Sequence, residues 1–365
     1  MPRVPVNRPS LPALVRVAGP SGAAVPDPAT AAALARAAEM LATGQLVVIP
    51  TETVYGLAAN ALDADAVALI YRVKGRPPDN PLIVHVSDTA MARRLAADWP
   101  EVAARATAAC WPGPLTVVVR KAAAVPKIVT AGGETVALRC PAVAVTRRLI
   151  EQAGCPLAAP SANRSEAVSP TTAAHVLDGL GSRVGLILDA GPCEHGLEST
   201  VLDCTVEPPR ILRPGPITAA TLAAVIGMPV LGPGNRAAPV AENRPAPPAS
   251  LDRSPGQRQR HYAPRTPLEV SAEAAPRVAE LLGSGSRIGW LTLRPEAAEV
   301  RRLADSPSLV VVPMPADAAA YGRMLYATLH ALDHRHLDRL VADAVPDETA
   351  WAAVHDRLSR ATSEI

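Results

Sequence analysis

Phenylalanine is absent from this chain of 365 residues, and only 2% of the residues are aromatic. The hydrophobic core must therefore be built mainly from Val, Leu, Ile and Ala. Scarce aromatic side chains also weaken the case for a nucleic-acid surface, because proteins that bind single strands stack the bases on aromatic rings. The net charge of +2 gives no general reason to expect binding to nucleic acids or membranes.

Long hydrophobic runs and paired cysteines are missing as well. No stretch approaches the roughly 20 apolar residues that a membrane-spanning helix needs, so we expect a soluble, cytoplasmic protein. The five cysteines form no C-x-x-C motif and are not spaced with histidines as zinc ligands are. We predict that they are reduced residues of the core or of strands, and that the chain has no disulfide framework and no metal site of its own.

The common nucleotide-binding fingerprints are also absent. The chain contains neither G-x-G-x-x-G nor G-x-x-x-x-G-K-[ST], so Rossmann and P-loop phosphate sites lack their signatures. Lysine is scarce too. Of the 36 basic residues only three are lysines, at Lys74, Lys121 and Lys127, and the others are arginines. Any phosphate site must therefore be built from other loops and mostly from arginine.

Proline clusters divide the chain. Seven of the 39 prolines lie in residues 2–28 and nine in residues 229–267, and such composition favours linkers over helices or strands. The prolines of the basic N-terminal stretch also disfavour the amphipathic helix of a transit peptide. We predict four segments: a flexible N-terminal extension (1–26), a large domain (27–231), a Pro-rich linker (232–266) and a small C-terminal domain (267–365).

Strand-like and helical patterns alternate in both predicted domains. In the large domain we expect strands at 46–49, 82–86, 115–120, 135–139, 157–159, 186–188, 199–203 and 210–213, with helices between them. After the linker we expect strands at 288–293, 309–312 and 337–341, and helices at 277–282, 317–332 and 348–360. This alternation predicts an α/β fold with a large, mixed sheet and a small second α/β domain.

The segment from Pro50 to His85 concentrates polar side chains on short loops between a predicted strand, a helix and a second strand. Such loops over an α/β sheet can face a ligand without leaving buried polar atoms unpaired. Lys74 offers a compact charge and Arg76 a planar fork, so this pair could hold two oxyanions of one polyphosphate. The same residues also fit a structural role, in which Gly75 caps the helix and both cations offset its dipole.

A second polar corner follows the apolar run that ends at Ala159. The hydroxyl and amide groups from Ser161 to Ser165, with Ser169 at the start of the next helix, can accept an anion, because free helix N–H groups and the dipole favour phosphate. Ser169 followed by Pro170 is also an ordinary helix N-cap. Both roles can hold together.

Arginines end two of the predicted strands. Arg213 is followed directly by Pro214, which keeps the arginine extended so that its side chain projects from the strand end, and Arg139 stands two residues before Pro141. Ser199 stands at the start of another apolar strand, and we expect such strand ends to converge at one sheet edge. In the linker, His261 and Tyr262 lie among arginines, either in a solvated basic tether or in a segment that closes over a charged ligand.

Several ordered motifs together resemble those of the threonylcarbamoyl-AMP synthases in their long form. They are Pro50 to Leu57, Lys74 to Leu82, Pro160 to Thr172, Ser199 to Val201, Arg213 to Gly215 and Ser254 to Pro264. The resemblance spans roughly residues 27–365, with dense motifs only in the first domain. It implies a YrdC-like catalytic domain with a large twisted sheet, followed by a smaller Rossmann-like α/β domain.

The resemblance also implies a reaction. Family members combine L-threonine, bicarbonate or CO2, and ATP into threonylcarbamoyl-AMP and release pyrophosphate. The product feeds threonylcarbamoyladenosine modification of tRNA beside the anticodon, through a downstream tRNA threonylcarbamoyl transferase complex. Mg2+ should accompany ATP through its phosphates and waters, because no carboxylate cluster marks a dedicated protein site. We expect no stable binding of nucleic acid and no membrane association.

Matched residue by residue, the resemblance implies three groups of site residues. The threonine-binding residues would be Thr53, His85, Arg139 and Ser199. The ATP-binding residues would be Arg76, Asn80, Thr135, Ser161, Ser169, Arg213 and Tyr262. The catalytic residues would be Lys74, Arg76, Ser161 and Asn163, and His261 would join Tyr262 in closing over the site.

The sequence departs from the family pattern in places. Glu166 stands where a small residue, usually glycine, is expected, and residues 257–260 lack an aromatic residue that the linker often has. Glu52 lies inside the first motif without an evident role. Two other functions fit parts of the pattern: a carbamoyltransferase of hydrogenase maturation, whose zinc-finger cysteines are missing here, and a non-catalytic RNA-binding module.

Overall fold

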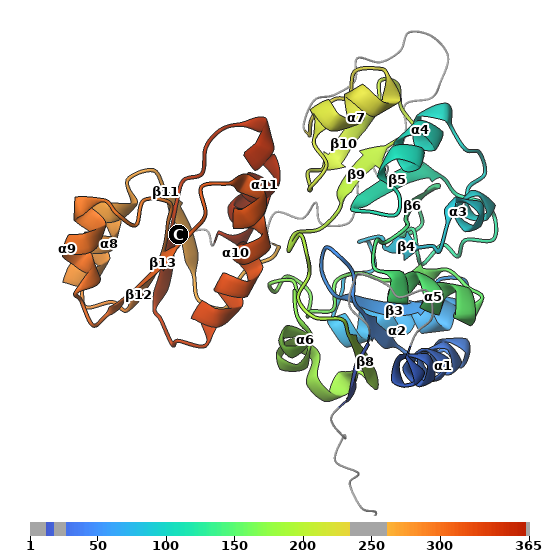
Figure 1. The fold of residues 1–365 in the computed structure, drawn as a ribbon, viewed down its shortest axis with the longest axis horizontal. Coiled ribbons are helices and arrows are strands. Elements are labelled where there is room, and N and C mark those ends of the chain that lie inside the picture. The colour runs from blue at the N-terminus through green and yellow to red at the C-terminus, as the bar shows by residue number, and fades with distance from the viewer. Residues whose placement is uncertain (1–11, 18–26, 234–260, 363–365) are drawn as a thin grey trace, which may run out of the picture.

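The computed structural model describes residues 12–17, 27–233 and 261–362. These residues form two α/β domains that lie side by side (Figure 1). The larger domain comes first in the chain, and the smaller one follows the linker. The predicted fold class, an α/β fold with a large mixed sheet and a smaller second α/β domain, is confirmed.

Ten strands form the sheet of the N-terminal domain. They are β1 (Ala13–Arg16), β2 (Val47–Ile49), β3 (Gly56–Asn60), β4 (Ile83–His85), β5 (Leu115–Arg120), β6 (Thr135–Arg139), β7 (Leu157–Ala158), β8 (Leu186–Asp189), β9 (Thr200–Asp203) and β10 (Arg210–Arg213). Their order across the sheet is β1-β8-β2-β3-β7-β4-β6-β5-β9-β10. Both parallel pairs, such as β4 with β6, and antiparallel pairs, such as β5 with β6, occur in it.

Helices pack around this sheet. They are α1 (Pro28–Ala42), α2 (Ala64–Lys74), α3 (Thr89–Leu95), α4 (Glu101–Cys110), α5 (Ala144–Ala153), α6 (Ala173–Leu180) and α7 (Ala219–Ile226), with a short 3-10 turn at Gly181–Arg183. The Asp63 carboxylate accepts from the first N–H groups of α2, and Gly75 ends that helix with a φ of 65°, which favours glycine. Val, Leu, Ile and Ala dominate the buried core, as the composition requires.

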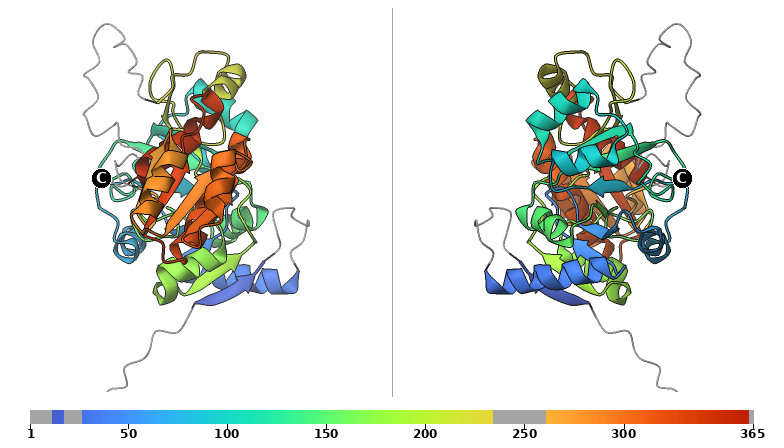
Figure 2. Two further views of the ribbon diagram at one scale, coloured as in Figure 1. Left: turned by 90° about the vertical axis from the view of Figure 1, so that its left-hand side faces the viewer. Right: turned by 90° about the vertical axis from the view of Figure 1, so that its right-hand side faces the viewer.

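The C-terminal domain has a four-stranded parallel sheet in the order β11-β14-β12-β13, from β11 (Leu268–Ser271), β12 (Ile288–Thr292), β13 (Leu309–Pro313) and β14 (Arg339–Asp343). Its helices are α8 (Ala274–Gly283), α9 (Ala298–Ala304), α10 (Ala318–Asp333) and α11 (Ala352–Ala361), with a 3-10 turn at Thr349–Trp351. Figure 1 shows α10 and α11 between this sheet and the N-terminal domain. The left view of Figure 2 shows α8 and α9 in front of the sheet.

The structure adds elements that the sequence did not reveal. Residues 13–16, within the expected flexible extension, form β1 and pair with β8 at the sheet edge. β3 was not predicted, because Gly-Leu-Ala-Ala-Asn has little strand propensity of its own. β11 and α9 were not predicted either. Most of the predicted linker lies outside the described residues, and the proposed domain boundaries stay a prediction.

The two domains share a hydrophobic cluster. Val54, Val168 and Leu197 of the first domain belong to the same buried group as Tyr326 and other residues of α10 and α11. Packing is close here, because a Cβ on Gly196 would lie 2.6 Å from the backbone oxygen of Arg323. The C-terminal domain is thus packed directly on loops of the N-terminal domain that lead to strand ends.

Candidate active site

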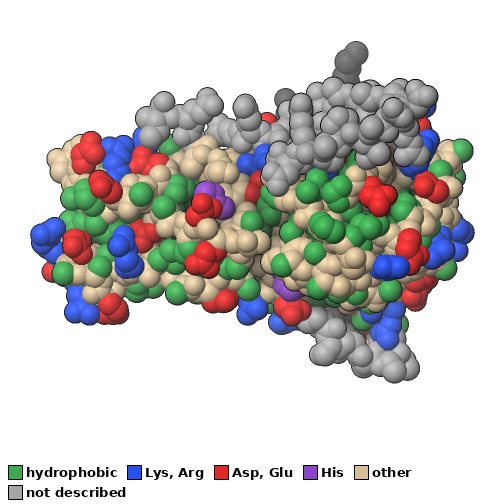
Figure 3. Space-filling view, turned by 90° about the horizontal axis from the view of Figure 1, so that it is seen from above, with side chains coloured by type: hydrophobic (Ala, Val, Ile, Leu, Met, Phe, Trp, Pro, Cys, Tyr) green, Lys and Arg blue, Asp and Glu red, His purple; other side chains and the backbone are tan. Residues whose placement is uncertain are grey.

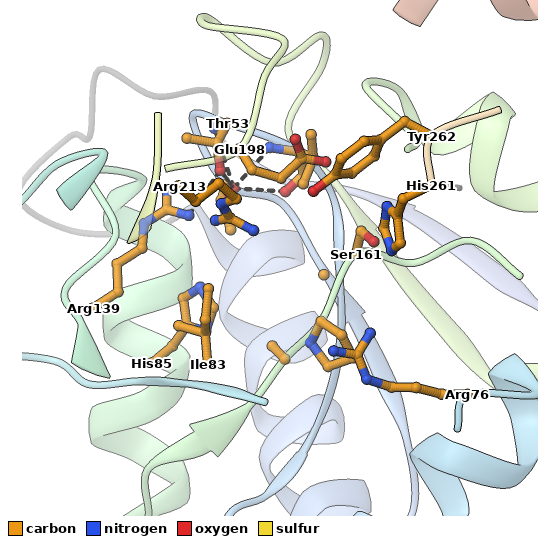
Figure 4. A pocket seen from close by; sticks show the side chains of 15 residues that line it. Thr53, Arg76, Ile83, His85, Arg139, Ser161, Glu198, Arg213, His261 and Tyr262 are labelled. Atoms are coloured by element: carbon orange, nitrogen blue, oxygen red, sulfur yellow. Dashed lines mark hydrogen bonds between the residues drawn. The ribbon is translucent and has the colours of Figure 1, made fainter. Parts of the chain in front are cut away.

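A small cavity of about 50 Å³ lies where loops and strand ends of the N-terminal sheet meet the start of the C-terminal domain (Figure 4). Its walls come from the β2–β3 connection, the loop after α2, strands β4 and β6, the loop after β7, and the ends of β9 and β10. The lining residues are Thr51, Thr53, Val54, Gly56, Arg76, Ile83, His85, Arg139, Ala159, Pro160, Ser161, Glu198, Arg213, His261 and Tyr262.

Arg139, at the end of β6, is held from two sides. Its Nη2 lies 2.7 Å from Glu52 Oε1, and its Nη1 donates to Thr53 Oγ1 at 2.8 Å. The other oxygen of Glu52 accepts the backbone N–H of Ala142 at 3.0 Å. Both charged side chains are almost completely buried, at 4% and 1% exposure. Glu52, for which the sequence suggested no role, thus fixes Arg139, which was predicted to bind threonine.

The loop that carries Thr53 is tied by a hydroxyl. Thr51 Oγ1 donates to the backbone oxygen of Val54 at 2.6 Å and accepts the N–H groups of Thr53 and Val54, each at 3.2 Å. It also lies 2.9 Å from the hydroxyl of Thr53. The loop therefore presents Thr53 to Arg139 in a fixed orientation.

Arg76 reaches the cavity from the loop after α2. Its guanidinium donates to the backbone oxygen of Asn80 at 3.0 Å, to the side-chain oxygen of Asn80 at 2.6 Å and to the backbone oxygen of Pro81 at 2.7 Å. Asn80 does not line the cavity and instead positions Arg76. In Figure 4, Arg139 and His85 lie on one side of the pocket and Arg76 on the other.

Lys74 lies behind the cavity wall. Its Nζ donates to the backbone oxygens of Ser161 and Asn163 at 2.6 and 2.5 Å, and to Asn163 Oδ1 at 3.3 Å. The Asn163 amide in turn donates to the backbone oxygen of Ala167 at 2.6 Å. Burial, together with the charge of Arg76, lowers the pKa of Lys74 well below its usual value. Of these residues, only Ser161 lines the cavity.

Arg213 and Ser199 form another connected pair. The Arg213 guanidinium donates to the backbone oxygen of Ser199 at 3.0 Å and to its hydroxyl at 3.1 Å. Ser199 Oγ lies 2.7 Å from the hydroxyl of Thr116 on β5. Arg213 lines the cavity, whereas Ser199 is fully buried behind it.

Ser169 is also fully buried and donates to Glu198 Oε1 at 2.6 Å. Glu198 reaches the cavity and interacts with Arg357 of the C-terminal domain, whose Nε lies 2.8 Å from Glu198 Oε2. Burial alone would raise the pKa of Glu198, but Arg357 and Arg213 outweigh this effect and lower it to about 2. The carboxylate is therefore charged at neutral pH.

Three cavity-lining side chains hold buried polar atoms that have no hydrogen-bond partner among the described residues: His85 Nδ1, His261 Nδ1 and Tyr262 OH. Burial is the main reason that the pKa of each histidine falls to about 3, so both rings are neutral. Native structures leave few buried polar atoms unpaired. Their convergence on one cavity indicates a site made for a polar ligand.

Two other predicted positions lie elsewhere. Thr135 begins β6, at the opposite end of that strand from Arg139, and does not line the cavity. Glu166 adopts a φ of 69°, a conformation that favours glycine, which explains why a small residue is expected there. Its side chain is exposed and stands away from the cavity wall, while its backbone oxygen accepts the N–H of Ala263 at 2.9 Å.

Among the described residues, no group of three or more His, Cys, Asp and Glu side chains could hold a metal ion. The two carboxylates nearest the cavity, Glu52 and Glu198, are both engaged by arginines. In the same part of the chain, no helix is long and apolar enough to cross a membrane. On the face drawn in Figure 3, acidic and basic side chains are interspersed over both domains.

Comparison with known proteins identifies the family. Residues 39–215 match the Sua5_yciO_yrdC family (Telomere recombination), and residues 217–363 match the family described as Threonylcarbamoyl-AMP synthase, C-terminal domain. The chain is 39% identical over 333 residues to the threonylcarbamoyl-AMP synthase of Bacillus subtilis, a match that covers 90% of this chain and 92% of that protein. The chain belongs to the threonylcarbamoyl-AMP synthase family.

An archaeal relative agrees along almost the whole length. The threonylcarbamoyl-AMP synthase of Pyrococcus abyssi is 37% identical over 337 residues, or 89% of this chain and 93% of that protein. The crystal structure of P. abyssi Sua5 complexed with L-threonine has a TM-score of 0.80 and 33% identity, and the match covers 96% of this chain and 97% of that one. The predicted resemblance and the predicted nucleotidyltransferase activity, threonylcarbamoyl-AMP synthesis for tRNA modification, are confirmed.

Proposed function

We propose that the cavity binds L-threonine on the Arg139 side and the phosphates of ATP on the Arg76 side, and joins them through a carbamate. The observation that carries this proposal is the arrangement of two buried arginines around unpaired polar atoms in one cavity. A planar guanidinium suits a carboxylate as well as a phosphate, so the cavity can take both substrates. The relative from P. abyssi, which was crystallised with L-threonine, supports the amino-acid half.

The threonine half consists of Arg139, Thr53 and His85. The guanidinium of Arg139 would fork the amino-acid carboxylate, and the unpaired His85 Nδ1 offers one further polar contact. Since His85 is neutral, it adds no second positive charge beside the substrate amine. Ser199, which was also predicted to bind threonine, lies behind the cavity wall, where its hydroxyl bonds to Thr116 and Arg213.

The ATP half consists of Arg76, Ser161 and Arg213 at the surface of the cavity. Lys74, Asn80, Asn163 and Ser169 brace these groups from behind through the hydrogen bonds described above. Thr135 remains a proposed nucleotide contact, although it lies at the other end of β6 from Arg139.

The chemistry needs positioning and charge neutralisation more than a covalent nucleophile. The threonine amine adds to CO2 and loses a proton to give a carbamate, whose oxygen attacks the α-phosphorus of ATP, while the bond to the β-phosphate oxygen breaks and pyrophosphate leaves. The arginines would neutralise charge that develops on the phosphates. Fixed donors of this kind are worth about 3 kcal/mol each in other enzymes.

Water must be kept from the carbamate and the adenylate. His261 and Tyr262 follow the linker and line the cavity, and both side chains are buried. The cavity of about 50 Å³ is far smaller than the roughly 300 Å³ or more that ligand pockets usually offer. We therefore infer that His261 and Tyr262 move away to admit ATP and return to cover it.

Mg2+ would enter with ATP and be held through the ATP phosphates and water molecules. The carboxylates beside the cavity are engaged by arginines and would not serve as its ligands. The ion would neutralise phosphate charge during the transfer. We further propose that the enzyme works in the cytoplasm and passes its product to a tRNA threonylcarbamoyl transferase complex. The interspersed surface charges give no single basic patch on the face drawn in Figure 3 for stable tRNA binding.

The two halves are tested by conservative substitutions and by separate titrations of the two substrates. Arg139→Lys should raise the KM for threonine at least tenfold and change the KM for ATP little, because a lysine cannot fork a carboxylate. Arg76→Lys should show the reverse. If both variants folded and raised the same KM, the proposed division of the cavity would be wrong.

A further inference from the structure

Among the described residues that line the cavity, Glu198 is the only acidic one, and the structure gives it an unusual set of partners. One oxygen, Oε1, accepts the Ser169 hydroxyl at 2.6 Å. The other, Oε2, accepts the Tyr326 hydroxyl at 3.0 Å and Arg357 Nε at 2.8 Å. The carboxylate thus joins a residue of the N-terminal domain to two residues of the C-terminal domain.

The two C-terminal partners come from the helices that face the N-terminal domain. Tyr326 lies on α10 and Arg357 on α11, and both are fully buried. Arg357 also donates to the backbone oxygen of Pro214, the residue that follows Arg213, at 3.1 Å. Its guanidinium carbon lies 4.9 Å from the centre of the Tyr262 ring. One arginine therefore touches three segments that build the cavity.

A buried ion pair contributes little net stability to an interface between two domains. Removing two charges from water costs several kcal/mol each, and apolar residues of similar size often stabilise an interface equally well. The neighbouring cluster around Val54, Val168 and Leu197 already supplies apolar contact between the domains. The hydrogen bonds to Glu198 instead fix the orientation of its carboxylate, because each of its two oxygens has defined donors.

We propose that Glu198 is a positioning residue through which Arg357 and Tyr326 of the C-terminal domain fix the Ser169 hydroxyl in the nucleotide half of the site, while Arg357 also holds the strand end that carries Arg213 through its bond to Pro214. This inference rests on the nucleotide role proposed above for Ser169 and Arg213. The C-terminal domain is then part of the catalytic unit. Its docking sets the affinity for ATP, while the threonine half, which is built around Glu52 and Arg139, stays independent of it.

Two tyrosines on the same helix provide a matched test. Tyr326→Phe removes the hydroxyl that donates to Glu198. Tyr321→Phe removes a hydroxyl that is also buried but has no hydrogen-bond partner in the described part of the chain. With purified full-length protein, we expect Tyr326→Phe to raise the KM for ATP at least fivefold, with the KM for threonine unchanged within twofold. Tyr321→Phe should leave both constants within twofold of wild type.

A stronger perturbation is Arg357→Lys, which keeps the charge but cannot reach Glu198 and Pro214 together. We expect at least a twentyfold rise in the KM for ATP, and Arg277→Ala, which breaks the Arg277–Glu269 ion pair remote from the cavity, should change it less than twofold. Thermal unfolding of each variant establishes whether it is folded. If Arg357→Lys fails to fold, the two tyrosine variants decide.

The outcomes distinguish a failure of the proposed function from a failure of the positioning role of Glu198. A wild-type protein without threonine-dependent pyrophosphate release would contradict the proposed function itself. With an active wild type, equal behaviour of Tyr326→Phe and Tyr321→Phe would overturn the positioning role. So would an equal rise of both KM values in Tyr326→Phe, because it would indicate general damage and not a displaced nucleotide site.

Discussion

Substitution of Glu52 by glutamine should weaken threonine binding although Glu52 does not line the cavity. In the structure, one oxygen of Glu52 pairs with Arg139 at 2.7 Å and the other accepts a backbone N–H at 3.0 Å. Glutamine has nearly the same shape, but its NH2 group must face one of these two donors. The substitution therefore removes a buried ion pair and leaves Arg139 free to turn away from the carboxylate position.

The size of the effect follows from this contact. A hydrogen bond to a charged group contributes about 1.5 to 3 kcal/mol, and every 1.4 kcal/mol is a factor of ten in affinity. We therefore expect Glu52→Gln to raise the KM for threonine by about tenfold to a hundredfold. The KM for ATP should change little, because Arg76 and Arg213 are held by other partners.

The assay measures pyrophosphate release while threonine is titrated at saturating ATP and bicarbonate. Glu101→Gln is the matched control, since it breaks the Glu101–Arg105 ion pair on the surface, where the Glu101 side chain is 72% exposed and such pairs contribute about 0 to 1 kcal/mol. Thermal unfolding checks that both variants are folded. A folded Glu52→Gln protein with the wild-type KM for threonine would refute the account of how Arg139 is held.

Three further predictions follow from the site. Arg76→Ala should lower threonine-dependent pyrophosphate release about a hundredfold with the fold intact, because a fixed donor is worth about 3 kcal/mol; retention of a tenth of the activity would contradict this. Tyr262→Ala should lower the same rate at least tenfold, and a full rate would exclude a covering role. Because burial lowers the pKa of His85 to about 3, the unfolded chain takes up a proton below about pH 6.5 and the folded protein does not, so stability falls as the pH drops. Between pH 6.5 and 5 the contribution of His85 amounts to about 1.6 kcal/mol, and unfolding measurements at both pH values should show that His85→Gln removes this share of the pH dependence.

Much of the N-terminal domain could be predicted because its sequence is locally consistent. Apolar runs such as 46–49 and 115–120 each follow a predicted helix, and the structure places β2 and β5 there. β3 and β1 could not be found in this way. β3 is a short, alanine-rich strand whose conformation is imposed by pairing with β2 and β7, and β1 forms by pairing with β8.

The candidate site was predicted in part for a similar reason. The sequence places three arginines, Arg76, Arg139 and Arg213, in a loop or at predicted strand ends. The structure brings all three to one cavity. The groups that hold them are not visible from local patterns. Glu52 looks like an ordinary loop acid until its pairing with Arg139 is known, and Arg357 lies 159 residues from Glu198 along the chain.

The cavity was expected to gather more of the polar residues than it does. Lys74, Asn80, Asn163, Ser169 and Ser199 were predicted as direct contacts, but the structure places them behind the wall, where they hydrogen-bond to lining residues or to loop backbone. Residues that line the cavity and residues behind its wall occur in the same sequence motifs, because both kinds need a fixed polar partner. Only the three-dimensional arrangement separates the residues that face a ligand from those that orient their neighbours.

We propose above that this protein activates threonine through a carbamate and ATP in one cavity. The most direct measurement is pyrophosphate release by the purified full-length protein with ATP, Mg2+ and bicarbonate, in the presence and absence of L-threonine. We predict release that requires threonine and is lost in Arg139→Ala. Release that is equally fast without threonine, or none with all substrates present, would contradict the claim.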